Sequence, residues 1–424
     1  MADSGIPPGE LVGAAEPPPA PSRWPAPIRS LRHRDFRYFW IGLLISVSGT
    51  WMQITAQGWL VWRITGQPIY LGLVGACGTV PMLLLTLPAG VIADRYSKHR
   101  IVVLTQTLAM AQAFVLAALV HTGAVRVWHV MILAGLLGIV NAFDMPTRQA
   151  MVMDLVGRGD LFNAISLNSG AFNSGRIIGP TVAGILVARM GFAPCFFINA
   201  LSFLPLILAL ATLRPRPIRP PAEGSFKRQI GDGMRWVRTH DIAFALLILT
   251  AISGVFAMPY TSLLPAFAEK VLGAGPERYG LLMSAPAVGA FATVFVIAWL
   301  GHRVRLGVAV TVGAFIFPVA LMLFSAVPNF PAALGCLALT GVGMMCFNMV
   351  SNTMLQKEPP DELRGRVMSL RAFVFAGLAP LGNLQIGAMG QWFGIRIAIA
   401  AGAVVCLLSA LVVVWRVPQV RRSR

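Results

Sequence analysis

Leu71-Gly-Leu-Val-Gly-Ala-Cys-Gly-Thr-Val-Pro-Met-Leu-Leu-Leu-Thr-Leu-Pro-Ala-Gly-Val-Ile-Ala93 is a stretch of sequence that stays apolar on every side of a helix. A strand of a membrane β-barrel would instead alternate apolar and polar residues over about ten positions. A helix needs ~20 mostly apolar residues to cross the hydrocarbon core of a bilayer, and this stretch supplies them. It is therefore predicted to be a transmembrane α-helix.

The whole chain has the composition of a membrane protein. Hydrophobic residues make up 56% of its 424 residues and charged residues only 12%, and the mean hydropathy is +0.72. No soluble fold could bury that much apolar surface. We predict an all-α integral membrane protein with twelve transmembrane helices, over residues 38–62, 70–93, 101–121, 127–147, 161–187, 194–213, 242–267, 279–300, 307–327, 331–355, 367–390 and 396–415.

The excess of basic residues is explained by its distribution along the chain. There are 34 Lys and Arg against 16 Asp and Glu, a formal net charge of +18. If the N-terminus is cytoplasmic, 27 of the basic residues fall in cytoplasmic segments and 6 on the other side, which leaves Arg176 within a span. This asymmetry predicts a protein of the bacterial cytoplasmic membrane with both termini inside. It argues against nucleic-acid binding, and the basic segments are expected to contact lipid headgroups.

The spans divide into two groups of six. Residues 1–30 are Pro-rich and predicted to be a disordered cytoplasmic tail. An N-terminal half is expected over residues 31–213 and a C-terminal half over 242–417. A cytoplasmic linker over 214–241, which contains the amphipathic stretch Phe226–Val237, should connect them, and a basic cytoplasmic tail is expected over 418–424. A weak repeat relates the stretch from Asp160 to Leu167 to that from Leu363 to Leu370, with a shift of 203 residues. Two parallel halves with a binding site between them are expected from such a repeat.

The loop after the second span carries a motif, Gly90-Val-Ile-Ala-Asp94-Arg95-Tyr-Ser97-Lys98-His-Arg100. It resembles the GxxxDRxGRR motif of the major facilitator superfamily, with Ser97 in place of a Gly. The resemblance implies the twelve-helix major facilitator fold and a cytoplasmic gate in which Asp94 pairs with a facing Arg or a helix N-terminus. Gly90 is expected to allow close approach of a helix. For the three basic residues, a simple topological role at the headgroups is an equal alternative.

A second motif lies in the fifth span, Gly170-x4-Gly175-x3-Gly179-Pro180-x2-Ala183-Gly184. It resembles the motif of drug:proton antiporters in the same superfamily and favours export over import. Small residues four apart also let any two helices pack closely, which is the simpler interpretation. Further segments, around Asp144-Met-Pro-Thr-Arg148 and Asp361-Glu-Leu-Arg-Gly, resemble the branch that contains enterobactin exporters and macrolide efflux proteins.

Polar residues form stripes on otherwise apolar spans and should avoid lipid. We expect some of them to face a central cavity, although hydrogen bonds between helices are an alternative for each Asn or Gln. Arg176 is the most costly of them, and it is expected to bind an anionic or oxygen-rich cargo or an acidic partner. Asp144, coupled through Arg148, is the first candidate for proton transfer and Asp94 the second. The candidates for the cavity are Gln53, Gln57, Asn141, Asp144, Arg148, Asn173, Arg176, Asn348 and Asn352.

These features predict a secondary transporter that exports a small amphipathic molecule, drug-like or siderophore-like, by alternating access in exchange for protons. A lysophospholipid flippase or a metabolite importer of the same fold is the alternative, and sequence alone does not separate a receptor from a transporter. An enzyme is not expected, because the six His residues are scattered and no nucleophile, metal or nucleotide motif is present. No cofactor or metal is expected, and the chain is expected to be a monomer.

Overall fold

The computed structural model describes residues 25–212, 226–300 and 305–419. In this part of the chain every regular element is a helix. Twelve helical segments are long and apolar enough to cross a membrane, and each coincides with one of the predicted spans. The prediction of an all-α protein with twelve transmembrane helices is confirmed.

Six helices form the first six spans: α1, α2 and α3 form one span each, α4 forms two, and α5 and α6 together form the sixth. Gly157 has a left-handed backbone (φ 72°) and breaks the long helix α4 into the fourth and fifth spans. The sixth span consists of two short helices that meet at Phe203. The elements are α1 (Arg34–Thr65), α2 (Pro68–Arg95), α3 (Lys98–His121), α4 (Val127–Met190), α5 (Ala193–Ser202) and α6 (Leu204–Ala211).

The second six spans follow the linker helix α7 (Phe226–Arg238), which coincides with the amphipathic stretch seen in the sequence. The seventh span contains a π-helical turn, η2 (Ser253–Ala257), and the eleventh is interrupted at Leu378. The remaining elements are α8 (Asp241–Ile252), α9 (Tyr260–Lys270), α10 (Pro276–Leu300), α11 (Leu306–Ala326), α12 (Phe330–Lys357), α13 (Asp361–Gly377), α14 (Ala379–Trp392) and α15 (Ile395–Arg416).

The end of the predicted N-terminal tail is ordered. Residues 1–24 lie outside the described part, but Ala26–Arg32 forms a 3-10 helix, η1, so the predicted tail over 1–30 extends too far. The physical reason is Asp160, a carboxylate only 2% exposed at the start of the fifth span. It accepts bonds from Arg29 Nε at 2.6 Å, Arg32 Nη2 at 2.9 Å and His33 Nε2 at 2.8 Å.

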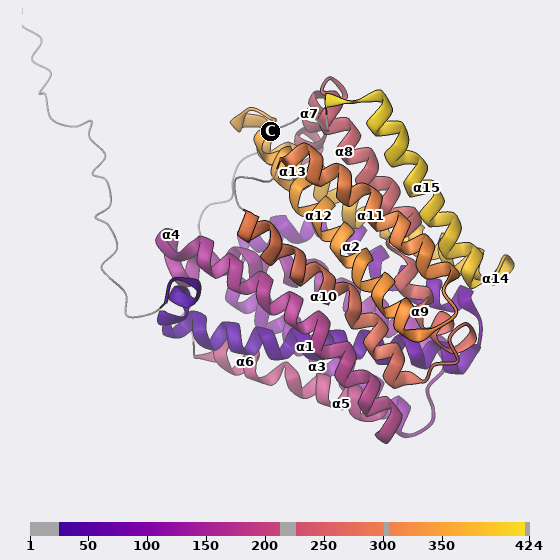
Figure 1. Ribbon diagram of the computed structural model, residues 1–424. Helices are drawn as coiled ribbons and strands as arrows, with labels where there is room; N and C mark the ends of the chain where they lie inside the picture. The colour runs from indigo at the N-terminus through magenta and orange to yellow at the C-terminus, as the bar shows by residue number, and fades with distance from the viewer. Residues whose placement is uncertain (1–24, 213–225, 301–304, 420–424) are drawn as a thin grey trace, which may run out of the picture.

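The helices form two groups, indigo to magenta for the first half and rose to yellow for the second (Figure 1). We call the face at which α1 begins and α15 ends the termini face, and the face at which α1 ends and α15 begins the far face. The two groups converge toward the far face and splay apart toward the termini face (Figure 1). Across the boundary α2 packs against α14, and α4 packs against α10.

Candidate functional site

The two halves are joined at the far face by one acidic residue, Glu269, at the end of α9. Its carboxylate accepts hydrogen bonds from Trp62 Nε1 and, at 3.1 Å, from Arg63 Nη1, both at the end of α1. The ammonium of Lys270 lies 5.0 Å from the centre of the Trp62 ring. Hydrogen bonds and a cation–π contact therefore hold the first and second halves together here.

Glycines bring the backbones of the two halves into contact at the same face. A Cβ atom on Gly72 of α2 would lie 2.9 Å from Cα of Gly387 in α14, and closer still to the backbone oxygen of Asn383. A Cβ on Gly280 of α10 would lie 3.0 Å from Cα of Gly184 in α4. Because these neighbours are backbone atoms, only residues without a side chain fit while the far face is closed.

Ser284 of α10 makes the hydrogen bonds across the boundary that lie deepest in the molecule. It is 2.9 Å from the hydroxyl of Thr181 and donates to the carbonyl of Ile177 at 3.0 Å. Toward the far face the two halves are therefore bound together both through Ser284 and through Glu269.

The motif of the fifth span packs against both halves. A Cβ on Gly175 would lie 2.7 Å from a methyl group of Val47, and one on Gly179 would lie 2.8 Å from the amide nitrogen of Met52, both in α1. Gly184, one turn beyond Pro180, instead approaches α10 of the second half, with 2.7 Å from its Cβ position to the carbonyl oxygen of Pro276. The motif therefore combines packing within one half with packing between halves.

The motif after the second span lies at the termini face, where the structure describes only part of it. The side chain of Asp94 lies outside the described part, and Arg95 and Arg100 are exposed. Lys98 forms an ion pair with Asp154 at 2.8 Å, within the first half. Among the described residues no atom lies within 4 Å of the Cβ position of Gly90, so the close helix approach expected at this glycine stays a prediction.

Asp144 lies at the centre of a buried polar cluster in the first half and is only 2% exposed. Its carboxylate is 3.1 Å from Nη2 of Arg148. It also accepts hydrogen bonds from Thr105 Oγ1 at 3.0 Å and Gln106 Nε2 at 2.8 Å. The Arg148 guanidinium also lies 5.3 Å from the ring centre of Phe172 in the fifth span. A carboxyl group and a guanidinium are thus paired in the interior of the first half, and the carboxyl group accepts two further hydrogen bonds.

Gln53 belongs to a second polar cluster, which connects three helices of the first half. Its amide donates to Gln112 of α3 at 3.1 Å and accepts from Asn199 of α5 at 2.7 Å. This is the interhelical hydrogen bonding that the sequence left as the alternative to a cavity position. Gln57 and Asn141, from the same predicted set, are half-buried.

Arg176 lies where the halves meet, at mid-depth in the fifth span. Its guanidinium is 5.3 Å from the ring centre of Trp51 in α1. The backbone carbonyl of the next residue, Ile177, accepts a hydrogen bond from Ser284 of the second half at 3.0 Å. Among the described residues no carboxylate lies within ion-pairing distance of Arg176. Asp144, which we expected to be the nearest acid, forms its ion pair with Arg148 instead. Asn173, one turn earlier, donates to a backbone carbonyl of its own helix.

Arg371 and Arg148 also lie inside spans, contrary to the count made from the sequence, which had assigned both to cytoplasmic segments. Arg371 belongs to α13 of the eleventh span, whereas we expected Arg176 to stand alone within the membrane. Its guanidinium donates to Asn352 Oδ1 at 3.1 Å and to the backbone oxygen of Asn348 at 3.2 Å, both in α12. The signal was available, because residue 371 lies inside the predicted span 367–390; the count had assigned it to the preceding loop.

Comparisons with known proteins agree with this architecture. A family model described as "Transmembrane secretion effector" matches residues 25–423. The Staphyloferrin A transporter of Staphylococcus aureus is 26% identical over 360 residues, which cover 85% of this chain and 90% of that protein. The Multidrug efflux pump Tap of Mycolicibacterium fortuitum is also 26% identical, over 89% of this chain and 94% of its own. Macrolide efflux protein A of Streptococcus pyogenes is 21% identical, over 85% of this chain and 90% of that protein.

Solved structures share the fold. The nucleoside transporter NupG superposes with a TM-score of 0.74 at 13% identity, over 90% of this chain and 98% of that one. A bacterial homolog of the human lysosomal transporter Spinster superposes with a TM-score of 0.69 at 15% sequence identity, over 92% of this chain and 96% of that one. These likenesses concern the arrangement of the helices.

Proposed function

The chain belongs to the transmembrane secretion effector family of the major facilitator superfamily, and from this membership we propose that it exports a small amphipathic molecule across the bacterial cytoplasmic membrane. Members of this superfamily are transporters and not enzymes. The observation that carries the proposal is the match over residues 25–423, which includes both halves. The relatives named for efflux each align over at least 85% of this chain.

We propose that transport proceeds by alternating access with the termini face in the cytoplasm. The uneven distribution of basic residues supports this orientation. In the present conformation the halves are bound together at the far face through Glu269 and through Ser284. This is the arrangement expected of a carrier that receives cargo from the cytoplasm. Release would require these contacts to break.

Arg176 is the proposed cargo-binding residue. It lies where both halves meet, next to the carbonyl that Ser284 of the second half binds, and no acidic residue of the described part forms an ion pair with it. A cation is costly in the membrane interior, and such residues commonly mark a transport pathway. The proposed cargo therefore carries a negative charge or several oxygen acceptors that can replace water around the guanidinium.

Asp144 is the proposed site of proton coupling. It is an acid deep within the bundle and already paired with a base, Arg148. Protonation of Asp144 would free the guanidinium to find another partner. Asp94, the second candidate, is proposed to act in the cytoplasmic gate.

Inside-out membrane vesicles from cells with and without the protein test the function. Staphyloferrin A and a macrolide are suitable probes, since relatives are named for them. Export predicts uptake into these vesicles that depends on the protein and stops when an uncoupler collapses the proton gradient. Uptake that persists after collapse and in Asp144→Asn would refute proton coupling at this residue. Uptake only by right-side-out vesicles would indicate an importer, and movement of lysophospholipid alone would indicate lipid transport.

A further inference from the structure

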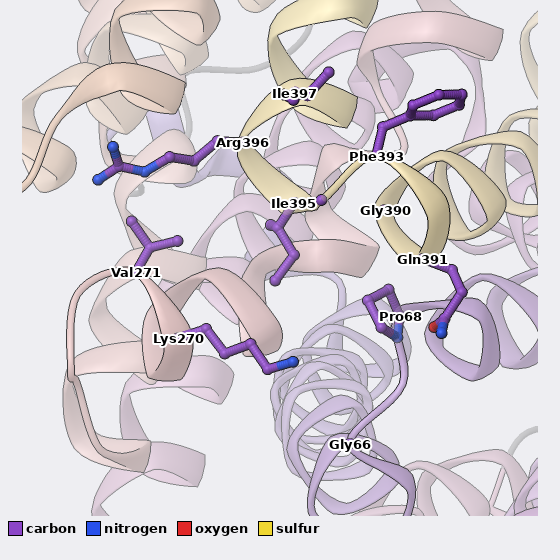
Figure 2. Close-up of a pocket in the computed structure, with 11 residues that line it drawn as sticks. Gly66, Pro68, Lys270, Val271, Gly390, Gln391, Phe393, Ile395, Arg396 and Ile397 are labelled. Carbon is purple, nitrogen blue, oxygen red and sulfur yellow. The ribbon is translucent and has the colours of Figure 1, made fainter.

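A cavity of about 560 Å³ opens at the far face between the two halves. The first half contributes the turn between α1 and α2, with Gly66 and Pro68. The second half contributes the end of α9 and the turn between α14 and α15. Figure 2 shows the side chain of Lys270 pointing toward Pro68, beneath Ile395, while Arg396 extends over Val271.

The charge of the cavity is positive. Lys270 and Arg396 line it, and no Asp or Glu is among the lining residues. Within the described part of the chain no carboxylate lies within ion-pairing distance of either cation, because the adjacent Glu269 is bound to Arg63. No side chain caps the N-terminus of α15, which begins at this point, so its first amides are also available to an anion.

Basic residues are concentrated at this cavity although they are rare in the other segments of the far face. The segments at the far face carry only six of the 34 basic residues. Two of these six line one cavity, and a third, Arg63, lies beside it. Basic residues on this side of the membrane are disfavoured by topology, so their clustering requires another explanation, and binding of an anion provides it.

The cavity also has an apolar side that faces lipid. Phe393 is 60% exposed and Ile397 is 58% exposed, and both line the cavity. Trp392, beside them, is 76% exposed. Exposed aromatic residues at the end of a span typically lie at the level of the headgroups. The cavity therefore combines cations with an apolar wall at the depth where a phospholipid carries its phosphate and the start of its acyl chains.

We infer that this cavity binds an anionic phospholipid, with its headgroup attracted by the positive charge of Lys270 and Arg396 and an acyl chain along Phe393 and Ile397. Because the cavity is lined by both halves, it exists as a single site only while the far face is closed. A lipid that binds one conformation better shifts the population toward it. Bound lipid thus stabilises the closed far face, a consequence that rests on the proposed alternating access.

Native mass spectrometry of the purified protein tests the binding site independently of transport. The protein is exchanged into nanodiscs of phosphatidylcholine containing a small fraction of phosphatidylglycerol, and the retained phosphatidylglycerol is measured. Each cation near a membrane surface should contribute about a five-fold preference for anionic lipid, so Lys270→Gln/Arg396→Gln should retain about 25-fold less. The matched control is Arg278→Gln, a basic residue of the same face that lies 5.4 Å from the Phe330 ring and does not line the cavity.

Retention of phosphatidylglycerol by the double variant at the level of the native protein would overturn the inference. Displacement by soluble glycerol phosphate with no measurable preference between the two lipids would show that the site takes a free anion, and would equally overturn it. Spin labels at positions 67 and 277, in a background without the five native cysteines, report the consequence for conformation. Phosphatidylglycerol should shorten the mean label distance in the native cavity and not in the double variant. Lipid binding without this shift would count against alternating access while leaving the site intact.

Discussion

Replacement of Gly72 by Ala should shift the protein away from the conformation described above. In that conformation the new Cβ would lie 2.9 Å from Cα of Gly387, and closer to the backbone oxygen of Asn383. Ordinary contacts begin at 3.4 Å, so α2 and α14 must separate by at least about 0.5 Å. A rotamer change cannot relieve the overlap, because both neighbours are backbone atoms.

The size of the effect follows from the cost of overpacking. Extra methyl groups in a tightly packed region cost about 1–3 kcal/mol. When the far face opens, α2 and α14 part and the cost disappears, while the gain in helix propensity from Gly to Ala is the same in both conformations. The ratio of closed to open far face should therefore fall by about 5-fold to 150-fold, since 1.4 kcal/mol corresponds to a factor of ten.

The distance between spin labels at positions 67 and 277, measured by pulsed electron spin resonance, reports this ratio directly. Gly72→Ala should broaden the distribution toward longer distances and lower the rate of export. Gly387→Ala should act in the same direction but more weakly, since its closest neighbour lies at 2.9 Å. The matched control is Gly335→Ala in α12, where no atom lies within 4 Å of the Cβ position. A distance distribution in Gly72→Ala identical to that of the control would refute the reasoning.

Three further substitutions have definite expected outcomes. Asp144→Asn leaves Arg148 buried without its partner and should lower the free energy of unfolding by about 3–5 kcal/mol. Adding Arg148→Gln to this variant should recover most of the melting temperature but not proton-coupled export. Recovery of export by the double variant would contradict the role of Asp144 in proton coupling. Arg176→Gln should preserve or raise the melting temperature in detergent, because it removes a costly cation, while export falls at least about ten-fold if one charge-assisted hydrogen bond to cargo is lost; unchanged export would exclude Arg176 from cargo binding. Asp160→Asn removes the charge that holds η1 and should speed tryptic cleavage within that helix, so an unchanged cleavage rate would show that the ion pairs do not hold it.

The sequence by itself determined the membrane spans and the family. Length and apolarity are local properties: a helix rises 1.5 Å per residue whatever surrounds it, so a stretch such as Leu71–Ala93 must span or be buried. The positive-inside distribution and the motif around Asp94 are likewise read without knowledge of packing. The errors in the count of basic residues, at Arg148 and Arg371, came from the positions of span boundaries and not from the principle.

Only the tertiary structure decided what each polar or small residue contacts. Gln53 and Gln57 lie on one stripe of α1, yet Gln53 is enclosed by α3 and α5 while Gln57 is half-buried. Gly179 and Gly184 belong to one motif, yet the first packs within its own half and the second packs across to α10. The physical reason is that helical periodicity defines which residues share a face, whereas the partner of that face depends on how all twelve helices pack. In a transporter with two halves, the partner also depends on the side of the membrane at which the halves are in contact.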